Sequence, residues 1–312
     1  MIEPFRPRWP WVGGDLQTLR NHLVRPLHIL PAGERLWLDL GDGDALAATL
    51  HRGDPGRPAV VLVHGLSGTE DSLYVGATAA HLLDNDFSVL RLNLRGAGAS
   101  QPRCRGQYHA GQSEDLRQAM NALPAALTGN GIAFVGYSLG ANVLLKFLGE
   151  GMPAGVVAAA AVSAPIDLAS AARQLAAPRN RLYQTWLLAM MRAEALAGPL
   201  TDAERRTVGS VRTVIDFDDR YVAPRNGFAS GADYYAHCSA ERFLRGISVP
   251  TLVVHAPNDP WIPMAAYKRV DWAGNSALAP LFGDGGHVGF HAAGSPVAWH
   301  DRAIASFFLS RL

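Results

Sequence analysis

The hydrophobic pattern of the chain changes repeatedly between two kinds of segment. Short runs that are apolar on both faces, such as residues 59–63 and 156–162, are typical of strands inside a parallel sheet. Between them lie longer segments, such as 74–83 and 114–127, whose apolar residues recur at helical spacing. The other predicted elements are strands at 36–40, 46–50, 88–94, 132–135, 251–256 and 277–282 and a closing helix at 297–309. The pattern therefore predicts an α/β fold, in which helices cover both faces of a mostly parallel sheet.

Two regions interrupt this alternation. Residues 1–35 are rich in Pro, Arg and Leu and show no clear period, so we expect an arm packed over the core. From 165 to 245 the strands lapse while helical spacing continues, which predicts a helical cap inserted between two strands of the core. The expected core is then formed by residues 36–164 and 246–312.

One junction between a strand and a helix carries a candidate nucleophile. The strand at 132–135 is followed within a few residues by helical spacing, and the turn between them is Gly136-Tyr137-Ser138-Leu139-Gly140. The apex of so tight a turn adopts strained backbone geometry, and small residues two positions away on either side relieve the crowding. Ser138 would expose its hydroxyl beside a helix N-terminus, where the Leu139 backbone N–H can meet a developing negative charge. The alternative is a structural Ser-Gly turn.

A serine hydroxyl is a weak nucleophile until a histidine accepts its proton, and a carboxylate must orient that histidine. Both partners are expected in loops that follow later strands. His287 fits best, because it lies in a glycine-rich loop directly after the last predicted strand, whereas His291 lies farther along and His300 falls in the closing helix. Asp259, in the loop after the preceding strand, is the expected carboxylate.

Other residues compete for these roles. Asp167 follows the strand at 156–162 and is a second candidate for the acid, whereas Asp284 is too near His287 to reach around to its Nδ1 easily. His64 is more typical of a hydrogen-bonded structural histidine. Ser67 stands beside a glycine but lacks the spacing of the turn at 136–140.

Two further parts of a site are predicted around the serine. The glycine-containing segment 64–68 follows the strand at 59–63, and its Leu66 N–H is the expected second donor to an oxyanion, with a plain turn as the alternative. Apolar side chains at helical spacing in the cap either line a pocket for an acyl chain or form the core of the cap itself. These side chains are Trp186, Leu187, Met190 and Met191.

Charge and composition narrow the classes of function. A net charge of +1, with no basic run of five or more residues, argues against nucleic-acid binding. Cys104 and Cys238 lie in no metal-binding spacing, so we expect free thiols in a reducing compartment and neither metal nor cofactor. The proline-broken N-terminus indicates no secretory signal, and no apolar stretch approaches the roughly 20 residues of a spanning helix. These features predict a cytoplasmic protein without a membrane span.

Several segments together resemble the YheT-like branch of the α/β-hydrolase superfamily, and the likeness extends over nearly the whole chain. Besides the turn at Ser138, the segments are Leu16-Gln17-Thr18-Leu19, Asp42-Gly43-Asp44, His64-Gly65-Leu66-Ser67-Gly68, Asn93-Leu94-Arg95-Gly96, Tyr108-His109-Ala110-Gly111, Asp115-Leu116-Arg117, Asp233-Tyr234-Tyr235 and Asn258-Asp259-Pro260. One departure is Asp15, which precedes Leu16 where members of this branch often carry His.

The resemblance implies a serine carboxylic-ester hydrolase of lipid metabolism with the triad Ser138, Asp259 and His287. Its substrates would be short- or medium-chain acyl esters or acylglycerols, with no cofactor. Acyl transfer to a small alcohol through the same acyl-enzyme remains open, as does a ligand-binding protein that no longer turns over. Haloalkane dehalogenase and epoxide hydrolase chemistry is disfavoured, because both need a carboxylate where Ser138 stands. Partner proteins and oligomeric state are not predicted.

Overall fold

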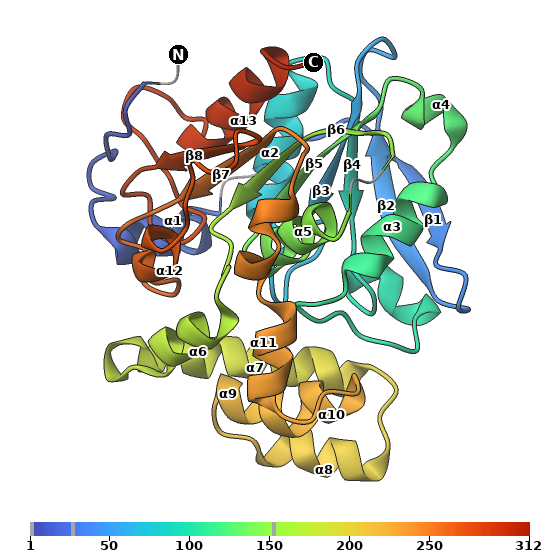
Figure 1. The fold of residues 1–312 in the computed structure, drawn as a ribbon, viewed down its shortest axis with the longest axis vertical. Helices are drawn as coiled ribbons and strands as arrows, with labels where there is room; N and C mark the ends of the chain where they lie inside the picture. Colours follow the sequence, from blue (N-terminus) through green and yellow to red (C-terminus); the bar gives the residue numbers. More distant parts are fainter. Residues whose placement is uncertain (1–2, 26–28, 152–153) are drawn as a thin grey trace.

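The central sheet has the α/β topology that the hydrophobic pattern predicts. The computed structural model describes residues 3–25, 29–151 and 154–312. Within these residues eight strands form one sheet, in the order β1-β2-β4-β3-β5-β6-β7-β8 (Figure 1). The strands are β1 Glu34–Asp39, β2 Ala45–His51, β3 Ala59–Val63, β4 Val89–Leu92, β5 Ile132–Tyr137, β6 Val156–Val162, β7 Thr251–His255 and β8 Leu278–Phe282. β2 pairs antiparallel with β1 and β4, and the other neighbours are parallel. The carboxyl ends of β3 to β8 therefore lie along one edge.

Helices cover both faces because side chains alternate across each buried strand. In β3, Val61 and Val63 join the core on one face, and Val60 and Leu62 join the core on the other. The first face is covered by α3 (Ser113–Asn121), α5 (Leu139–Gly149) and α12 (Met264–Lys268), and the second by α2 (Leu73–Leu83) and α13 (Trp299–Leu309). The predicted fold class is thus confirmed.

A second group of helices lies outside the sheet, between β6 and β7. It contains α6 Leu168–Ala176, α7 Arg181–Ala197, α8 Asp202–Ser210, α9 Val214–Phe217, α10 Ala223–Arg225 and α11 Gly231–Cys238. Figure 1 shows these helices gathered below the core, and we refer to residues 165–245 as the cap. The cap has a hydrophobic cluster of its own, which includes Leu187, Met191, Val208 and Phe217.

The pattern missed one helix in the N-terminal arm. Helix α1 (Gly14–Val24) was not predicted because its polarity is inverted: Gln17 and Thr18 are buried, whereas Leu16 and Leu23 are exposed. A pattern search expects the apolar face of a helix to be the buried one. Residues 1–2 and 26–28 of the predicted arm lie outside the described residues.

The helix predicted at 114–127 is in fact two helices. α3 ends at Asn121, and the short α4 (Ala125–Thr128) begins after Pro124, which has an extended backbone. Proline lacks a backbone N–H and disfavours helical geometry in the residue before it. The helical spacing of the apolar residues continues across this break, so periodicity alone did not reveal it.

Three of the segments that carry the family resemblance meet in one buried ion cluster. Arg95, in the loop after β4, donates to both carboxylate oxygens of Asp115 in α3, at 2.9 and 2.7 Å, and to Asp44 at 2.6 Å. Asp44 also accepts the backbone N–H groups of Arg105 and Gly106. Burial by itself lowers the pKa of the Arg95 guanidinium, but the neighbouring carboxylates raise that pKa above its ordinary value. These segments therefore connect the turn between β1 and β2, α3 and the loop after β4.

Replacing Arg95 with Met leaves Asp44 and Asp115 buried without their cation. We expect the free energy of unfolding of Arg95→Met, measured by urea denaturation, to fall by about 3–5 kcal/mol. Arg52→Met is the control, because it removes an exposed ion pair with Glu34 and should change this free energy by less than about 1 kcal/mol. Equal losses in the two variants would show that the buried cluster is worth no more than a surface pair.

Candidate active site

Ser138 stands at the junction between β5 and α5 in a strained conformation. Its φ of 50° and ψ of −120° are rarely adopted by residues other than glycine. A Cβ atom on Gly140 would lie 2.2 Å from the carbonyl oxygen of His64, and one on Gly136 would lie 2.7 Å from Ala141 Cα. Gly140 therefore allows α5 to begin in close contact with the end of β3, and Gly136 allows the end of β5 to lie against the first turn of α5.

His287 lies between Ser138 and Asp259. Its Nε2 is 2.9 Å from Ser138 Oγ, and its Nδ1 is 2.8 Å from Asp259 Oδ2. The other carboxylate oxygen, Oδ1, accepts the backbone N–H groups of Trp261 at 2.8 Å and Ile262 at 3.0 Å. Because both oxygens of Asp259 are engaged, the carboxylate is held in the orientation that faces His287.

The surroundings favour an ionised Asp259 although the residue is buried. Burial raises the pKa of the carboxyl, but the charge and hydrogen bond of His287 and the Trp261 N–H hold that pKa below its ordinary value. The indole ring of Trp261 lies against the His287 ring, with 4.3 Å between the ring centroids. An ionised Asp259 accepts a hydrogen bond from Nδ1–H, which keeps the proton on Nδ1 and leaves Nε2 free to accept a proton from Ser138.

Two backbone N–H groups beside Ser138 are available to a ligand. Leu139 is the first residue of α5, so its N–H has no acceptor within the helix. Leu66 lies in the loop after β3, next to Gly65, where a Cβ atom would lie 3.0 Å from Ser138 Cβ. In the part of the chain that the structure describes, neither N–H donates a hydrogen bond to another residue. The structure thus places Leu139 and the loop that contains Leu66 beside the serine, and their role as oxyanion donors stays a prediction.

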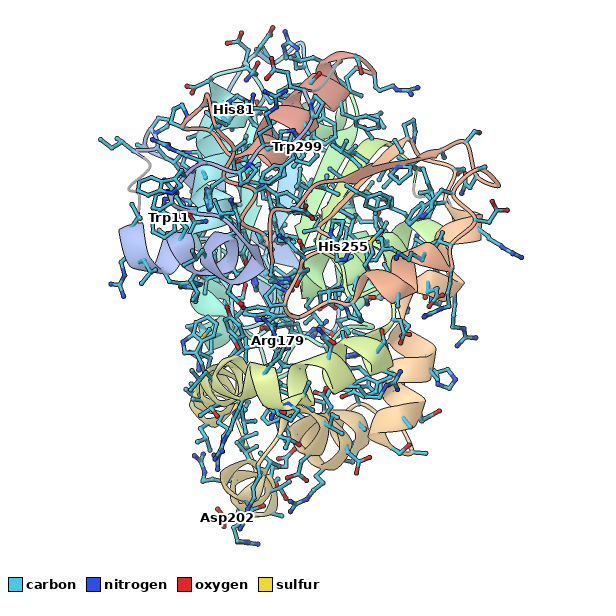
Figure 2. The ribbon with its side chains drawn as sticks, turned by 90° about the vertical axis from the view of Figure 1, so that its left-hand side faces the viewer. Trp11, His81, Arg179, Asp202, His255 and Trp299 are labelled. Atoms are coloured by element: carbon cyan, nitrogen blue, oxygen red, sulfur yellow. The ribbon has the colours of Figure 1, made fainter. Side chains whose placement is uncertain are left out.

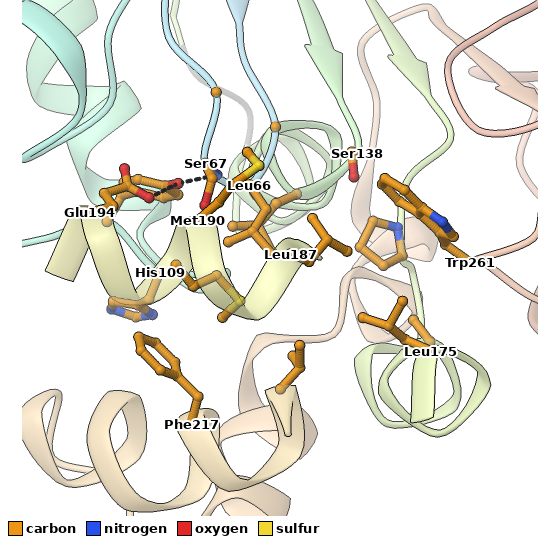
Figure 3. A pocket seen from close by; sticks show the side chains of 18 of the residues that line it. Leu66, Ser67, His109, Ser138, Leu175, Leu187, Met190, Glu194, Phe217 and Trp261 are labelled. Carbon is orange, nitrogen blue, oxygen red and sulfur yellow. Dashed lines mark hydrogen bonds between the residues drawn. The ribbon is translucent and has the colours of Figure 1, made fainter. Parts of the chain in front are cut away.

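The loop that contains Leu66 is connected to the cap. The Ser67 N–H donates to the hydroxyl of Tyr108 at 2.6 Å, and that hydroxyl donates to the Glu194 carboxylate of α7 at 3.1 Å (Figure 3). Burial raises the pKa of Glu194 to about 7. The sequence did not predict this connection: Tyr108 lies in a segment of the family resemblance, but nothing in the sequence around Glu194 marks it as a partner of Tyr108.

A cavity of about 590 Å³ extends from Ser138 into the space between the core and the cap. The cap side chains Trp186, Leu187, Met190 and Met191 all line it, together with Leu175 and Phe217. Figure 3 shows Leu175, Leu187, Met190 and Phe217 around this space. Leu187 and Met191 also belong to the hydrophobic cluster of the cap. The two interpretations of these side chains, pocket lining and cap core, therefore both describe their positions.

Asp167 and His300, the other candidates for the acid and the base, make contacts away from Ser138 and His287. Asp167 caps α6 by accepting the Ser170 N–H at 3.0 Å, and it pairs with Arg269 at 2.8 Å. His300 lies in α13, with its Nε2 3.2 Å from Asp301.

Two of the other histidines, His64 and His291, are buried in surroundings that lower the pKa of the ring. His64 Nε2 accepts the Leu94 N–H, and burial lowers the pKa of this histidine to about 4. Burial likewise lowers the pKa of His291 to about 3, with Arg20 as the next largest cause. Of the histidines considered, His287 is the one whose ring the structure places in hydrogen-bonding distance of Ser138.

Within the described residues 3–25, 29–151 and 154–312, no group of three or more His, Cys, Asp and Glu side chains is arranged to hold a metal ion. Cys104 and Cys238 are free thiols, and both are buried. None of the helices in these ranges combines the length and the apolar character needed to cross a bilayer.

Comparison with known proteins shows the class to which this fold and site belong. The family model described as the alpha/beta hydrolase fold matches residues 58–293, so the chain belongs to this family. Within the family it is a YheT-like member: it is 32% identical to the YheT protein of Escherichia coli (strain K12) over 286 residues, which cover 88% of this chain and 83% of that protein. The resemblance found in the sequence is thereby confirmed.

Two other proteins are similar to this chain at lower sequence identity. The monoacylglycerol lipase of Saccharomyces cerevisiae is 26% identical over 81% of this chain, but the match spans only 59% of the lipase. The crystal structure of the esterase Pf2001 from Pyrococcus furiosus superposes with a TM-score of 0.60 at 15% identity, covering 92% of this chain and 99% of the esterase. This second likeness shows the shared fold.

Proposed function

We propose that the protein is a carboxylic-ester hydrolase in which Ser138 is the nucleophile, His287 the general base and Asp259 the residue that orients the base. The observation that carries the proposal is the continuous hydrogen-bonded chain from Ser138 Oγ through His287 to Asp259, at 2.9 and 2.8 Å. Family membership supports it, because relatives such as the yeast monoacylglycerol lipase are named for ester hydrolysis.

The reaction follows from the positions of these groups. His287 Nε2 accepts the Ser138 proton while Oγ bonds to the ester carbonyl carbon, and the resulting oxyanion accepts hydrogen bonds from the Leu66 and Leu139 N–H groups. Asp259 stabilises the imidazolium that forms. His287 then donates its proton to the leaving alkoxide oxygen as the C–O bond breaks, which leaves an acyl-enzyme. Water then attacks the acyl carbon with His287 again as base, and His287 returns the proton to Ser138 Oγ as the C–Oγ bond breaks, which releases the carboxylic acid and restores the serine.

The cavity supports a small-molecule ester with an apolar acyl part as the substrate. Its volume of about 590 Å³ lies within the range of roughly 300–1,000 Å³ that is typical of small-molecule sites. The apolar side chains of the cap face the space beside Ser138, which favours an apolar acyl chain over a polar group. We propose that this chain is short or medium in length. We therefore propose acyl esters or acylglycerols as the substrate class.

Ser138→Ala removes the attacking oxygen and leaves the rest of the site in place. We expect the rate of p-nitrophenyl butyrate hydrolysis to fall by a factor on the order of 10⁴ or more, and covalent labelling by a fluorophosphonate probe to be lost. Ser306→Ala, at an exposed position of α13, is the control and should behave like the wild type. Activity of Ser138→Ala within tenfold of the wild type would refute the assignment, provided the thermal melt is unchanged.

Asp259→Asn and Asp167→Asn test which acid orients the base. Asparagine at 259 presents an amide group to His287 and favours the wrong tautomer, so we expect kcat to fall by about 10³–10⁴-fold. Asp167 pairs with Arg269 instead, and its replacement should change kcat by less than about threefold. Steady-state kinetics on the same ester distinguishes the two variants, and the reverse order of effects would move the acid to position 167.

Trp186→Ala and Met190→Ala test the proposed acyl pocket. Each enlarges the cavity beside Ser138, and since a methylene in an apolar pocket contributes roughly 1–3 kcal/mol, the preferred acyl chain should become longer. The measurement is kcat/KM for p-nitrophenyl esters of increasing chain length.

The matched control is Leu182→Ala, one helical turn before Trp186, where the side chain is 85% exposed. Fluorophosphonate labelling of Ser138 should persist in all three variants. An unchanged chain-length profile in both pocket variants would assign these side chains to the core of the cap alone.

A further inference from the structure

Helix α1 is in direct contact with both loops that carry the candidate base and acid. Figure 2 shows α1 on the outer surface of the core, above the cap helix that follows Arg179. A Cβ atom on Gly14 would lie 2.0 Å from the Asn258 carbonyl oxygen, and one on Gly286 would lie 2.3 Å from the Gly14 carbonyl oxygen. There is no room for a side chain at these contacts. This helix lies outside residues 58–293, which the family model matches.

The backbone around His287 depends on groups from other segments. Gly286 and Val288 flank it with φ values of 61° and 56°, a left-handed conformation that a β-branched residue such as valine rarely adopts. Three successive N–H groups of this loop donate to side chains from three separate segments. The pairs are Gly286 to Asn258 Oδ1 at 2.9 Å, His287 to Thr18 Oγ1 at 2.9 Å and Val288 to Ser163 Oγ at 3.2 Å.

The hydroxyl of Thr18 is oriented toward the base by a second hydrogen bond. Its proton is donated to the Gly14 carbonyl oxygen at 2.7 Å, so a lone pair of Oγ1 accepts the His287 N–H. Thr18 and His287 are 7% and 6% exposed, respectively, so water does not readily replace this contact. Loss of the hydroxyl would leave the N–H of the base buried without a partner.

The neighbouring Gln17 holds the far end of the same loop. Its Oε1 accepts the His291 N–H at 2.7 Å, and its Nε2 donates to the His291 carbonyl oxygen at 3.1 Å. The same Nε2 donates to the Trp11 carbonyl oxygen at 2.6 Å. A fully buried side-chain amide therefore uses both ends to bind the loop backbone four residues after His287.

We propose that Thr18, supported by Gln17, is a positioning residue that sets the place of His287 Nε2 relative to Ser138 Oγ. The proposal rests on the serine hydrolase function proposed above. Thr18 acts through the backbone of His287 and supplies no proton or charge to the reaction. It gives a role to the segment Leu16-Gln17-Thr18-Leu19, which the proposed chemistry does not otherwise use.

Thr18→Val keeps the shape of the side chain and removes its oxygen, whereas Thr18→Ser keeps the oxygen. For Thr18→Val we expect kcat per labelled active site to fall by about 10–100-fold, because a displacement of the base of 1 Å or less has effects of this size. KM should change little, since valine keeps the shape of the cavity wall at position 18. The rate of fluorophosphonate labelling should fall by the same factor, because it uses the same proton transfer. Thr18→Ser should recover most of the lost kcat.

Thr185→Val is the matched control. Thr185 makes the same hydrogen bond to the carbonyl oxygen four residues earlier, Arg181, but it is exposed on α7. Its replacement should leave kcat and the labelling rate unchanged. A general cost of removing a helical threonine hydroxyl would appear in both variants.

Several outcomes would overturn the proposal. One is a Thr18→Val protein with a lower melting temperature or a smaller labelled fraction but an unchanged kcat per labelled site, which would make Thr18 a purely structural residue. If Thr18→Val does not fold, Gln17→Met takes its place, and an unchanged kcat per labelled site in that variant refutes the proposal. A wild type that neither labels nor hydrolyses esters would instead refute the proposed function.

Discussion

The close packing of α5 against the carboxyl end of β3 is the constraint on which the site depends. Helix α5 begins one residue after Ser138, and a Cβ atom on Gly140 would be 2.2 Å from the His64 carbonyl oxygen. Ser138, directly before α5, has a positive φ of 50°, and Gly65, next to Leu66, lies against its side chain. Because the neighbouring strands are parallel, the loops after β7 and β8 end at the same edge and deliver Asp259 and His287 there.

Side chains from outside the central sheet form hydrogen bonds to the loops at this edge. Thr18 and Gln17 of α1 bind the His287 loop, and Glu194 of the cap reaches the Leu66 loop through Tyr108. Helix α1 is itself tied to the cap, since Asp15 accepts hydrogen bonds from Arg179 and Tyr183. Asp15 thus joins α1, which contacts the His287 loop, to α7, which lines the cavity.

Much of the fold could be predicted because its strongest signals are local. Runs that are apolar on both faces marked the interior strands, and the loss of strands after residue 164 marked the cap. The failures also have local causes. Helix α1 buries its polar residues Gln17 and Thr18 and exposes Leu16, so its pattern is inverted, and Pro124 divides a helix whose spacing continues past it.

The sequence by itself determined the fold class, the tight turn at Ser138 and the short list of candidate His and Asp partners. Each of these depends on a local signal, which is either a spacing within a few residues or a place directly after a strand. Only the tertiary structure decided that His287, 149 residues from Ser138, is in hydrogen-bonding distance of it, while Asp167 pairs with Arg269. It alone also revealed the contacts of Thr18 and Glu194. The physical reason is that these contacts join elements far apart in the chain, and a single polar residue on a helix carries no local mark of the backbone it will meet.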